Sequence, residues 1–255
     1  MADTHKRKTI GAVETTFDIL NVLSETEPVG VSEISEKFDM STSTVFTHLN
    51  TLLQQGYLVK TGTTYQRSLQ FLEDGGIIRQ HYESVQLLKS KVNELASTTG
   101  EIVGVAVEER GYRIILYRSA GEMAAGDDIP IGNHTYMHWT SLGKAILAHL
   151  SSARRSEIID QHGLPRGTKR TLTNRNELED ELELIRQQGY ATDDEEHLRG
   201  VRGVAVPIFD SDQNVVSSIG ITGPRTRFQS SYVSKMLKTL EYAKNEIEVQ
   251  SQYYR

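Results

Sequence analysis

GVSEISEKFDMSTSTVFTHLNTLLQQGYLVKTGTTYQR, residues 30–67, is the stretch that decides the fold. Its apolar spacing predicts a short helix over residues 31–38, a turn, and a second helix that begins after the N-cap residue Ser41. Two short strands, residues 57–59 and 65–67, then flank a polar turn. This order is that of a winged helix-turn-helix, a motif that places one helix in a DNA groove.

The second helix of this stretch has two distinct faces. Val45, Leu49 and Leu52 follow the i, i+4, i+7 spacing of a buried stripe. The opposite face is rich in hydroxyl groups, which contact phosphates or base edges, and Asn50 suits adenine. A polar helix face can also serve solubility alone, so the preceding turn is what favours DNA binding. We expect DNA contacts from Thr42, Ser43, Thr44, Phe46, Thr47 and Asn50 on the helix and from Lys60 and Arg67 on the wing.

Length and composition limit the remaining possibilities. A chain of 255 residues suits two domains, and its 34 acidic against 28 basic residues give no chain-wide attraction to DNA. No cysteine occurs, which excludes disulfides, thiolate metal sites and cysteine nucleophiles. No stretch approaches the ~20 apolar residues of a membrane span, and no apolar run follows the basic N-terminal cluster. We therefore expect a cytoplasmic protein without a membrane partner.

The segments that flank the quoted stretch also have helical patterns. Residues 12–24 predict an amphipathic helix whose apolar set, at helical spacing, is Val13, Phe17, Leu20 and Leu23. Residues 68–82 predict a linker helix in which the pair Gly75–Gly76 marks a bend or a flexible joint, because glycine weakens a helix interior.

The remainder of the chain predicts a second, mixed domain. The expected helices are 83–99, 140–150, 152–162, 176–188 and 230–252, and the expected strands are 101–107, 112–118, 129–131, 190–193, 203–209 and 215–222. Strands that pair as hairpins with helices packed to one side indicate an α+β fold with a mainly antiparallel sheet. The predicted domains are a winged helix over residues 1–67, a linker helix over 68–82, and an effector-binding and oligomerisation domain over 83–255.

Five stretches together resemble the IclR (isocitrate lyase regulator) family of transcription factors. They are AVETTFDILNVL (12–23), STSTVFTHLNTLLQQGYL (41–58), TSLGKAILAHL (140–150), GYATDDEEHLRGVRGVAVPIFD (189–210) and SIGITGP (218–224). Each stretch alone is a weak signal, but five in this order are specific and cover nearly the whole chain. The resemblance implies a winged helix, a linker helix and an effector-binding domain of GAF/profilin-like type, assembled as a homodimer or dimer of dimers.

The resemblance also implies where a small-molecule effector binds. The implied residues are Thr135, Trp139, Ser141, Leu142, Asp193, Val201, Gly203, Gly220 and Thr222. Hydroxyls and N–H groups at a helix start suit the carboxylate of an organic or sugar acid, while Asp193 suits a hydroxyl or amine. Gly203 and Gly220 stand where many relatives have polar side chains, so the ligand class stays open. Trp139 either stacks on the ligand or fills core volume.

Two other patterns suggest metal binding or acid–base chemistry. His134 and His138 have the i, i+4 spacing of a helical metal site, but an extended segment there favours core or pocket histidines. The run DDEEH, residues 193–197, follows a predicted strand, which favours a loop at the edge of a pocket. No nucleophile elbow, Walker loop, dinucleotide fingerprint or zincin motif is present. We therefore expect no catalytic site, no metal and no cofactor.

The N-terminal part of the chain is acidic, which is unusual for a DNA-binding domain. Residues 1–80 contain seven Lys and Arg against ten Asp and Glu, a net charge of −3, whereas DNA is held chiefly by cations. Either binding is weak and highly cooperative, or a salty cell interior screens the repulsion, as in IclR-family members from halophilic archaea. The basic cluster at residues 5–8 either contacts phosphates or is a solvated start.

These patterns favour a regulator that binds a roughly palindromic operator in double-stranded DNA and responds to a small metabolite. The alternative is a metabolite-binding protein or an enzyme with a vestigial helix-turn-helix.

Overall fold

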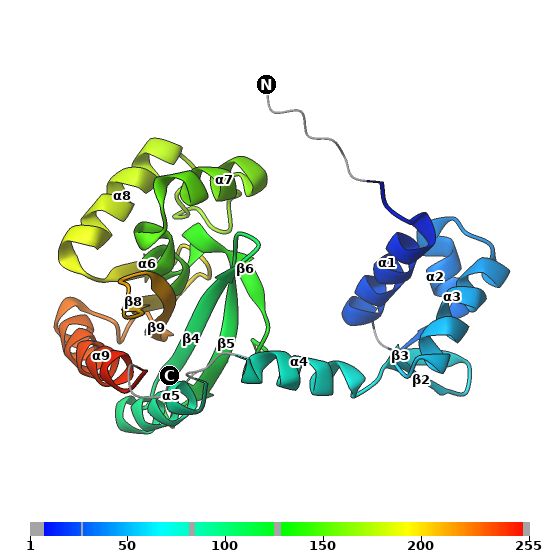
Figure 1. Cartoon of the computed structure of the whole chain (residues 1–255), viewed down its shortest axis with the longest axis horizontal. Helices are drawn as coiled ribbons and strands as arrows, with labels where there is room; N and C mark the ends of the chain where they lie inside the picture. Colours follow the sequence, from blue (N-terminus) through cyan, green and yellow to red (C-terminus); the bar gives the residue numbers. More distant parts are fainter. Residues whose placement is uncertain (1–7, 27, 82–84, 125–128, 252–255) are drawn as a thin grey trace. The chain divides into compact units, whose positions relative to one another are not determined.

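The computed structural model describes residues 8–26, 28–81, 85–124 and 129–251. The chain divides into two compact units, Met1–Ile78 and Arg79–Arg255 (Figure 1). Each unit has a hydrophobic core of its own. Helices and a mainly antiparallel sheet make up the larger unit, which confirms the predicted α+β class.

The first unit is a helical bundle closed by a small antiparallel sheet. Its elements are α1 (Gly11–Thr26), β1 (Val29–Gly30), α2 (Val31–Phe38), α3 (Thr42–Gln54), β2 (Leu58–Thr61) and β3 (Thr64–Arg67). The N-cap of α3 is Ser41, whose hydroxyl accepts a hydrogen bond from the Thr44 N–H. The predicted stripe of Val45, Leu49 and Leu52 is buried. The winged helix-turn-helix predicted from the sequence is therefore confirmed.

Helix α1 buries only part of its predicted apolar set. Ile19 and Leu23 belong to the core, and the Thr16 hydroxyl lies 2.8 Å from His48 Nδ1 of α3, whereas the side chains of Val13 and Phe17 are 48% and 62% exposed. Phe17 and Ile19 lie about 200° apart around a helix, so Phe17 is on the face opposite to Ile19. Helical spacing identifies apolar residues that share a side of a helix, but it does not show which side packs against the core.

Helix α4 (Gln70–Gln80) follows the wing. It is attached to the first unit by the Tyr57 hydroxyl, which donates to the Asp74 carboxylate at 2.9 Å. The helix continues through Gly75 and Gly76, so the pair does not interrupt it. The two glycines instead weaken the helix, by roughly 1 kcal/mol each relative to alanine.

Within the described residues, the second unit is built on a six-stranded antiparallel sheet with strand order β6-β5-β4-β9-β8-β7 (Figure 1). Its strands are β4 (Ile102–Glu109), β5 (Tyr112–Ala120), β6 (His134–Tyr136), β7 (Ala191–Asp194), β8 (Val201–Phe209) and β9 (Val215–Pro224). Its helices are α5 (Val85–Thr99), the 3₁₀ helix η1 (Met137–Trp139), α6 (Ser141–His149), α7 (Ser152–His162), α8 (Arg175–Gln188) and α9 (Ser230–Ser251). None of the helices described is both long and apolar enough to cross a membrane.

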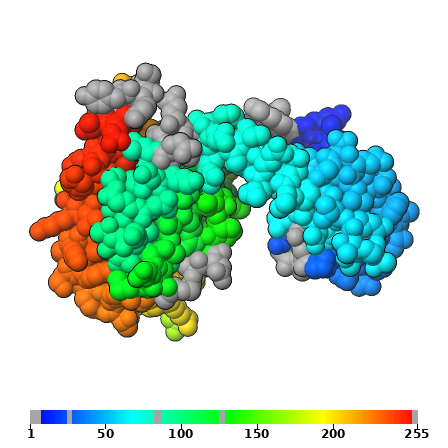
Figure 2. Space-filling model, turned by 90° about the horizontal axis from the view of Figure 1, so that it is seen from below, coloured from blue at the N-terminus to red at the C-terminus, as the bar shows by residue number. Residues whose placement is uncertain are grey.

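Helices cover both faces of this sheet, so the prediction of helices on one side was wrong. α5 and α9 pack on one face, and Figure 2 shows them side by side at the surface. α6, α7 and α8 form a second core on the other face. Double coverage explains why the β4 sequence IVGVAV is continuously apolar instead of alternating.

The third strand of the second unit begins later than predicted. A strand was expected over residues 129–131, but β6 covers His134–Tyr136. Gly132 has a positive φ of 83°, and its N–H bonds the carbonyl of Ile115 at 2.8 Å. The chain thus meets β5 at this turn, where the left-handed backbone redirects it toward the sheet, and regular pairing with β5 continues from His134.

Candidate DNA interface and effector cavity

The predicted DNA contacts lie on the surface of the first unit. Lys60 and Arg67 share one face of the wing hairpin, because Lys60 pairs with Tyr65 and Arg67 with Leu58. The Lys60 ammonium lies 5.2 Å from the centroid of the Tyr65 ring. All of the predicted side chains are exposed, namely Thr42, Ser43, Thr44, Phe46, Thr47, Asn50, Lys60 and Arg67.

Local hydrogen bonds determine which donor and acceptor groups the start of α3 presents to DNA. The Thr47 hydroxyl donates to the Ser43 carbonyl at 2.9 Å, so it faces a partner as an acceptor. The Ser41 hydroxyl lies within hydrogen-bond distance of the hydroxyls of Ser43 and Thr44. The ring of Phe46 is 49% exposed and suits apolar contact with a thymine methyl group.

The second unit contains a cavity of about 250 Å³ between its sheet and the start of α6. Strand register explains part of its wall. Asp193 pairs with Gly203, Gly203 with Thr222, and Thr222 with Ile102, so one row across four strands presents these positions on the same face. The lining residues are Ile102, Gly104, Arg113, Ile115, Arg118, Ile129, Thr140, Ser141, Leu142, Asp193, His197, Leu198, Gly200, Val201, Thr222, Gly223 and Pro224.

The first turn of α6 forms one side of the cavity. Thr140 is the N-cap, and its hydroxyl accepts from the Gly143 N–H at 3.0 Å. Thr140, Ser141 and Leu142 all line the cavity. Because the first N–H groups of a helix lack partners inside the helix, this turn presents donors and a partial positive charge to a ligand.

The predicted effector residues fall into three groups in the structure. Ser141, Leu142, Asp193, Val201 and Thr222 line the cavity. Gly203 and Gly220 lie where the sheet packs against α6. Thr135 and Trp139 do not line the cavity, but they contact Arg113 and His197, which do.

The two glycines allow α6 to approach the sheet. A Cβ atom at Gly203 would lie 2.8 Å from the Ser141 hydroxyl oxygen, and one at Gly220 would lie 3.0 Å from a methyl group of Leu142. The space that a side chain at position 203 would fill is thus taken by a hydroxyl from the helix. The polar group expected from the strand is supplied by Ser141 instead.

Thr135 and Trp139 act through residues of the wall. The Thr135 hydroxyl accepts from the Arg113 guanidinium at 2.7 Å. The Trp139 indole donates to the Pro165 carbonyl at 2.8 Å and stacks on His197, with ring centroids 5.6 Å apart. Trp139 is therefore not a lining residue of the cavity. It packs against His197, which does line the cavity.

Two arginines of β5, Arg113 and Arg118, line the cavity and were not predicted. Arg113 is only 2% exposed. Its place inside the apolar segment YRIILYR is the signal that could have identified it, because a cation in a buried strand requires a polar partner. Side chains on a regular strand alternate between its two faces. Because Arg118 lies five residues after Arg113, the sequence alone places it on the opposite face of β5.

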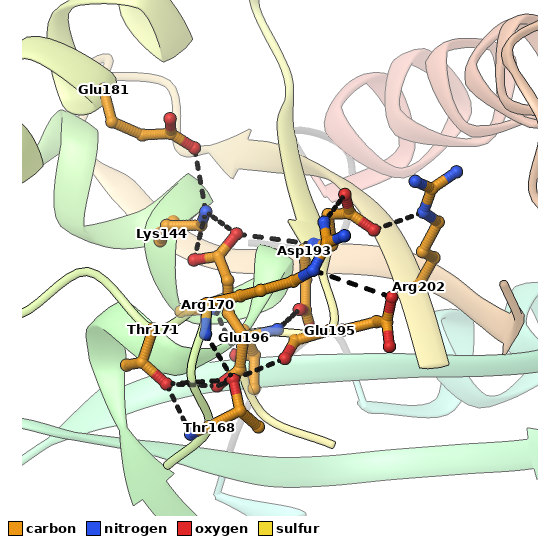
Figure 3. A network of polar contacts seen from close by, with 12 residues as sticks. Lys144, Thr168, Arg170, Thr171, Glu181, Asp193, Glu195, Glu196 and Arg202 are labelled. Atoms are coloured by element: carbon orange, nitrogen blue, oxygen red, sulfur yellow. Dashed lines mark hydrogen bonds and ion pairs between the residues drawn. The ribbon is translucent and has the colours of Figure 1, made fainter. Parts of the chain in front are cut away.

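The acidic turn at residues 193–197 is held in place by cations from separate segments (Figure 3). Asp194 binds Arg202 and, at 2.5 Å, Arg170. The turn also receives hydrogen bonds from Thr168 and Thr171, whose hydroxyls bond the Glu196 carbonyl. Glu195 is bound by Arg225 at 2.6 Å. Most carboxylates of this turn are therefore engaged in holding its shape.

Lys144 of α6 holds this turn through an ion pair with Glu196. Its ammonium is fully buried and lies 2.7 Å from a Glu196 oxygen and 2.8 Å from Glu181 on α8 (Figure 3). Burial lowers the pKa of Lys144, but the two carboxylates raise it more, and the net shift is upward. Lys144 therefore stays charged and links α6, α8 and the turn.

Asp193 differs from its neighbours because its carboxyl lines the cavity. It is 6% exposed and accepts a hydrogen bond from the Glu196 N–H at 2.8 Å. Burial, followed by the nearby charge of Glu196, raises the pKa of Asp193 to about 7. The carboxyl is thus present in both protonation states near neutral pH and can donate to a ligand or accept from it.

The two histidines considered as a metal pair lie in different elements. His134 is exposed in β6, whereas His138 is buried in η1 and lies 3.0 Å from the Pro165 carbonyl. Burial lowers the pKa of His138. Over the part of the chain that the structure describes, no group of three or more His, Asp or Glu is placed to hold a metal ion.

A winged helix with an exposed polar α3, joined to a domain with a cavity lined by apolar, polar and charged side chains, defines a ligand-responsive transcriptional regulator. The chain belongs to the IclR family. Residues 80–249 match the family described as bacterial transcriptional regulator IclR C-terminal, and residues 12–62 match the IclR helix-turn-helix domain. The resemblance drawn from the five sequence stretches is therefore confirmed.

Similar proteins extend over almost the whole chain. The chain is 29% identical over 257 residues to the HTH-type transcriptional regulator KdgR of Dickeya chrysanthemi, covering 100% of this chain and 84% of KdgR. It is 26% identical to the probable regulator ArcR of Halobacterium salinarum, covering 97% and 96%. The crystal structure of Thermotoga maritima IclR superposes with a TM-score of 0.79 at 26% identity, covering 95% and 99%. Family members are regulators, so the enzyme alternative is not supported.

Proposed function

We propose that this IclR-family regulator binds a roughly palindromic operator as a homodimer or dimer of dimers, in the cytoplasm, and that a small organic or sugar acid in the cavity modulates this binding. The observation that carries the proposal is that one chain combines an exposed polar α3 with a cavity whose partly apolar lining includes hydrogen-bond donors and cations. One winged helix contacts few base pairs, so a two-fold assembly and a two-fold operator follow.

Exposed apolar side chains support assembly with a second copy of the chain. Ile10 and Phe17 at α1 are 71% and 62% exposed, and Leu69 and Leu72 at α4 are 81% and 72% exposed. Contiguous exposed apolar side chains commonly mark protein–protein contacts. We assign these surfaces of α1 and α4 to the contact between protomers.

The chemistry of the cavity supports an acid as the effector. The first turn of α6 and the guanidinium of Arg113 favour a carboxylate, and Asp193 favours a ligand hydroxyl. A related structure, that of a double mutant of the inducer-binding domain of PobR from Acinetobacter, was solved as a complex with 3-hydroxybenzoic acid. It is 26% identical to this chain, has a TM-score of 0.59, and the match covers 64% of this chain.

The acidic first unit requires an explanation within this proposal. Residues 1–80 carry a net charge of −3, and residues 1–7, which include most of the basic cluster, lie outside the described residues. Cooperative binding by several protomers predicts a steep dependence on protein concentration and loss of binding at high salt. Adaptation to a salty cell predicts instead that binding persists at high salt, since screening removes the repulsion.

Footprinting of the DNA upstream of the protein's own gene, over a salt series, tests the proposal. We expect a protected, roughly two-fold site. Replacing Asn50 by alanine removes a base contact and should weaken binding by roughly 1–3 kcal/mol at one position of each half-site. Asn176→Ala, at an exposed asparagine of α8 in the second unit, is the matched control and should bind like the wild type. Absence of a protected site at every salt concentration would refute DNA regulation by this chain.

A further inference from the structure

We infer that Gly104 sets the size of the effector, and that the ligand carries an apolar side group, as large as an isopropyl or phenyl group, which lies over this glycine. This inference rests on the proposed effector role of the cavity. It goes further because it assigns the size and polarity of the ligand body and the residue of β4 that selects for them.

Gly104 lies inside β4, between Val103 and Val105, where a glycine is unfavourable. Glycine loses more conformational freedom on folding than any other residue, and it has no side chain to pack against neighbouring strands. A glycine in a strand interior often marks a place where a ligand or another backbone approaches closely. The position of Gly104 therefore requires a reason from its surroundings.

Two other glycines line the described part of the cavity, and the protein itself requires both of them. Gly200 has a φ of 77°, a left-handed conformation that other residues rarely adopt. A Cβ atom at Gly223 would lie 2.5 Å from a carboxylate oxygen of the buried Glu101. Backbone conformation explains the first glycine, and packing explains the second.

Gly104 differs from these two because its surroundings would accept a side chain. The atoms nearest to an added Cβ are a methyl group of Leu142 at 3.7 Å and a methyl group of Ile115 at 3.8 Å, which are ordinary van der Waals distances. Its φ is outside the left-handed region. Neither packing nor backbone conformation requires glycine at position 104. The missing side chain instead leaves space in the cavity that Gly104 lines.

The surroundings of this space are hydrocarbon. Ile102 and Gly104 are two residues apart on β4, so they share the face that lines the cavity. Leu142 of α6 and Ile115 of β5 line the cavity on either side of Gly104. An apolar ligand group removes apolar surface from water here, whereas a ligand hydroxyl would lose its hydrogen bonds to water. The part of the ligand over Gly104 is therefore apolar.

The sheet order shows that a very short acid cannot reach both Asp193 and this space. Asp193 belongs to β7, and strands β8 and β9 lie between β7 and β4. With neighbouring strands about 4.8 Å apart, β4 and β7 are about 14 Å apart, and the Asp193 side chain covers only part of this distance. A two- or three-carbon acid bound at Asp193 leaves the space over Gly104 empty, whereas an acid with a larger body fills it.

Thermal unfolding of the full chain without ligand provides the first test. Gly104→Ala should leave the melting temperature of the second unit unchanged or raise it by up to about 4 °C, because the methyl group fits and the strand loses a glycine. Gly220→Ala should lower it by about 3 °C or more, since its Cβ would lie 2.8 Å from the Val204 carbonyl oxygen. A comparable loss in both variants would show that packing requires Gly104, and would overturn the inference.

Calorimetric titration with 2-hydroxy acids tests the size of the ligand. Lactate, 2-hydroxyisovalerate and mandelate share a carboxylate and a hydroxyl but carry a methyl, an isopropyl and a phenyl group. We expect at least one of the two larger acids to bind about 10-fold more tightly than lactate, because each buried methylene contributes about fourfold in affinity. Equal or weaker binding of both larger acids would overturn the inference.

A second pair of acids tests the polarity of the ligand body. Gluconate and 2-hydroxyhexanoate are both six-carbon 2-hydroxy acids, but gluconate carries four further hydroxyl groups. We expect 2-hydroxyhexanoate to bind more tightly, since hydroxyl groups placed between Leu142 and Ile115 gain no partner from these side chains. Tighter binding of gluconate would show that the space holds a polar body, as in a sugar acid, and would contradict the inference.

Substitution at position 104 assigns the preference to this glycine. Gly104→Val fills the space with a branched side chain and should weaken binding of the preferred larger acid by about 10-fold or more, while lactate binding stays within about threefold. Gly104→Ala should have a smaller effect in the same direction, and circular dichroism verifies that both variants are folded. Gly75→Ala in α4, where nothing lies within 4 Å of the added atom, is the control and should retain the full preference.

The outcomes separate this inference from the proposed function. An unchanged preference in both variants at position 104 would overturn the inference and leave an acid-binding cavity in place. Failure of all five acids to bind the wild type would overturn the proposed effector class, and the inference with it.

Discussion

Asp193 illustrates how neighbouring residues assign different roles to similar side chains. Four carboxylates occur in the run DDEEH, yet Asp194, Glu195 and Glu196 are each bound by a cation, whereas Asp193 lines the cavity. Lys144 keeps its charge inside the protein because two carboxylates surround it. The turn is thus a rigid support that presents one carboxyl to the ligand.

The titration of Asp193 predicts a specific pH dependence of stability. Its pKa rises from an ordinary value of 3.8 to about 7 in the folded protein. Between these values the folded state binds the proton more tightly than the unfolded state does. The free energy of unfolding contributed by this group therefore falls as the pH rises, by about 1.4 kcal/mol per pH unit, and levels off above pH 7.

Urea unfolding of the wild type and Asp193→Asn at pH 5, 6, 7 and 8 measures this contribution. The difference in free energy between the two proteins should change across this range, because the amide does not titrate. Asp212→Asn, at an exposed aspartate, should follow the wild type. Parallel curves for the wild type and Asp193→Asn would show that Asp193 is ionised throughout.

At the scale of elements, close approach of backbones decides where α6 lies. Gly143 is inside this helix, and a Cβ atom there would lie 2.2 Å from the Met137 carbonyl oxygen. The absence of a side chain lets η1 fold back against α6 and positions Thr140 as the N-cap. The cavity therefore depends on a glycine that helix propensity alone would disfavour.

Two alanine substitutions at helical glycines should have opposite effects. Gly143→Ala should destabilise the second unit by about 1–3 kcal/mol, because the new methyl group overlaps a carbonyl that cannot move freely. Gly75→Ala in α4 should stabilise that helix by up to about 1 kcal/mol, since nothing lies within 4 Å of the added atom. Chemical unfolding of both variants measures the effects. A stabilising Gly143→Ala would contradict the packing of η1 on α6.

At the scale of the whole molecule, the two sites belong to separately built units. The core around Ile34 and Leu49 lies within Met1–Ile78, and the cores on the two faces of the larger sheet lie within Arg79–Arg255. Each unit buries its own apolar side chains, as an independently folding domain does. Helix α4 connects the two units along the chain, so it is one route by which the proposed effector can influence DNA binding.

A fragment that comprises residues 79–255 tests this organisation. We expect it to fold, to bind the same acid with an affinity within about threefold of that of the full chain, and to bind no operator, because its cavity is formed by residues of the second unit alone. Titration calorimetry and gel shift provide the two measurements. Loss of ligand binding in a folded fragment would show that the first unit contributes to the site.

The sequence by itself determined the local structure and the family. Periodic apolar residues and the cap Ser41 specify α2 and α3, because helical spacing and capping act over a few residues. Five ordered stretches were sufficient to identify the IclR family. Of the predicted effector residues, Ser141, Leu142, Asp193, Val201 and Thr222 line one cavity, and their role in binding stays a prediction.

Only the tertiary structure decided which further side chains reach that cavity and which apolar side chains remain exposed. Arg118 lines the wall because a bulge shifts β5 against β4. Trp139 lies behind the wall, where it binds the Pro165 carbonyl, and Phe17 is exposed because α1 packs through the opposite face, which carries Ile19. In each case the outcome depends on contact with a distant segment, whereas sequence periodicity reports only the repeat of the element itself.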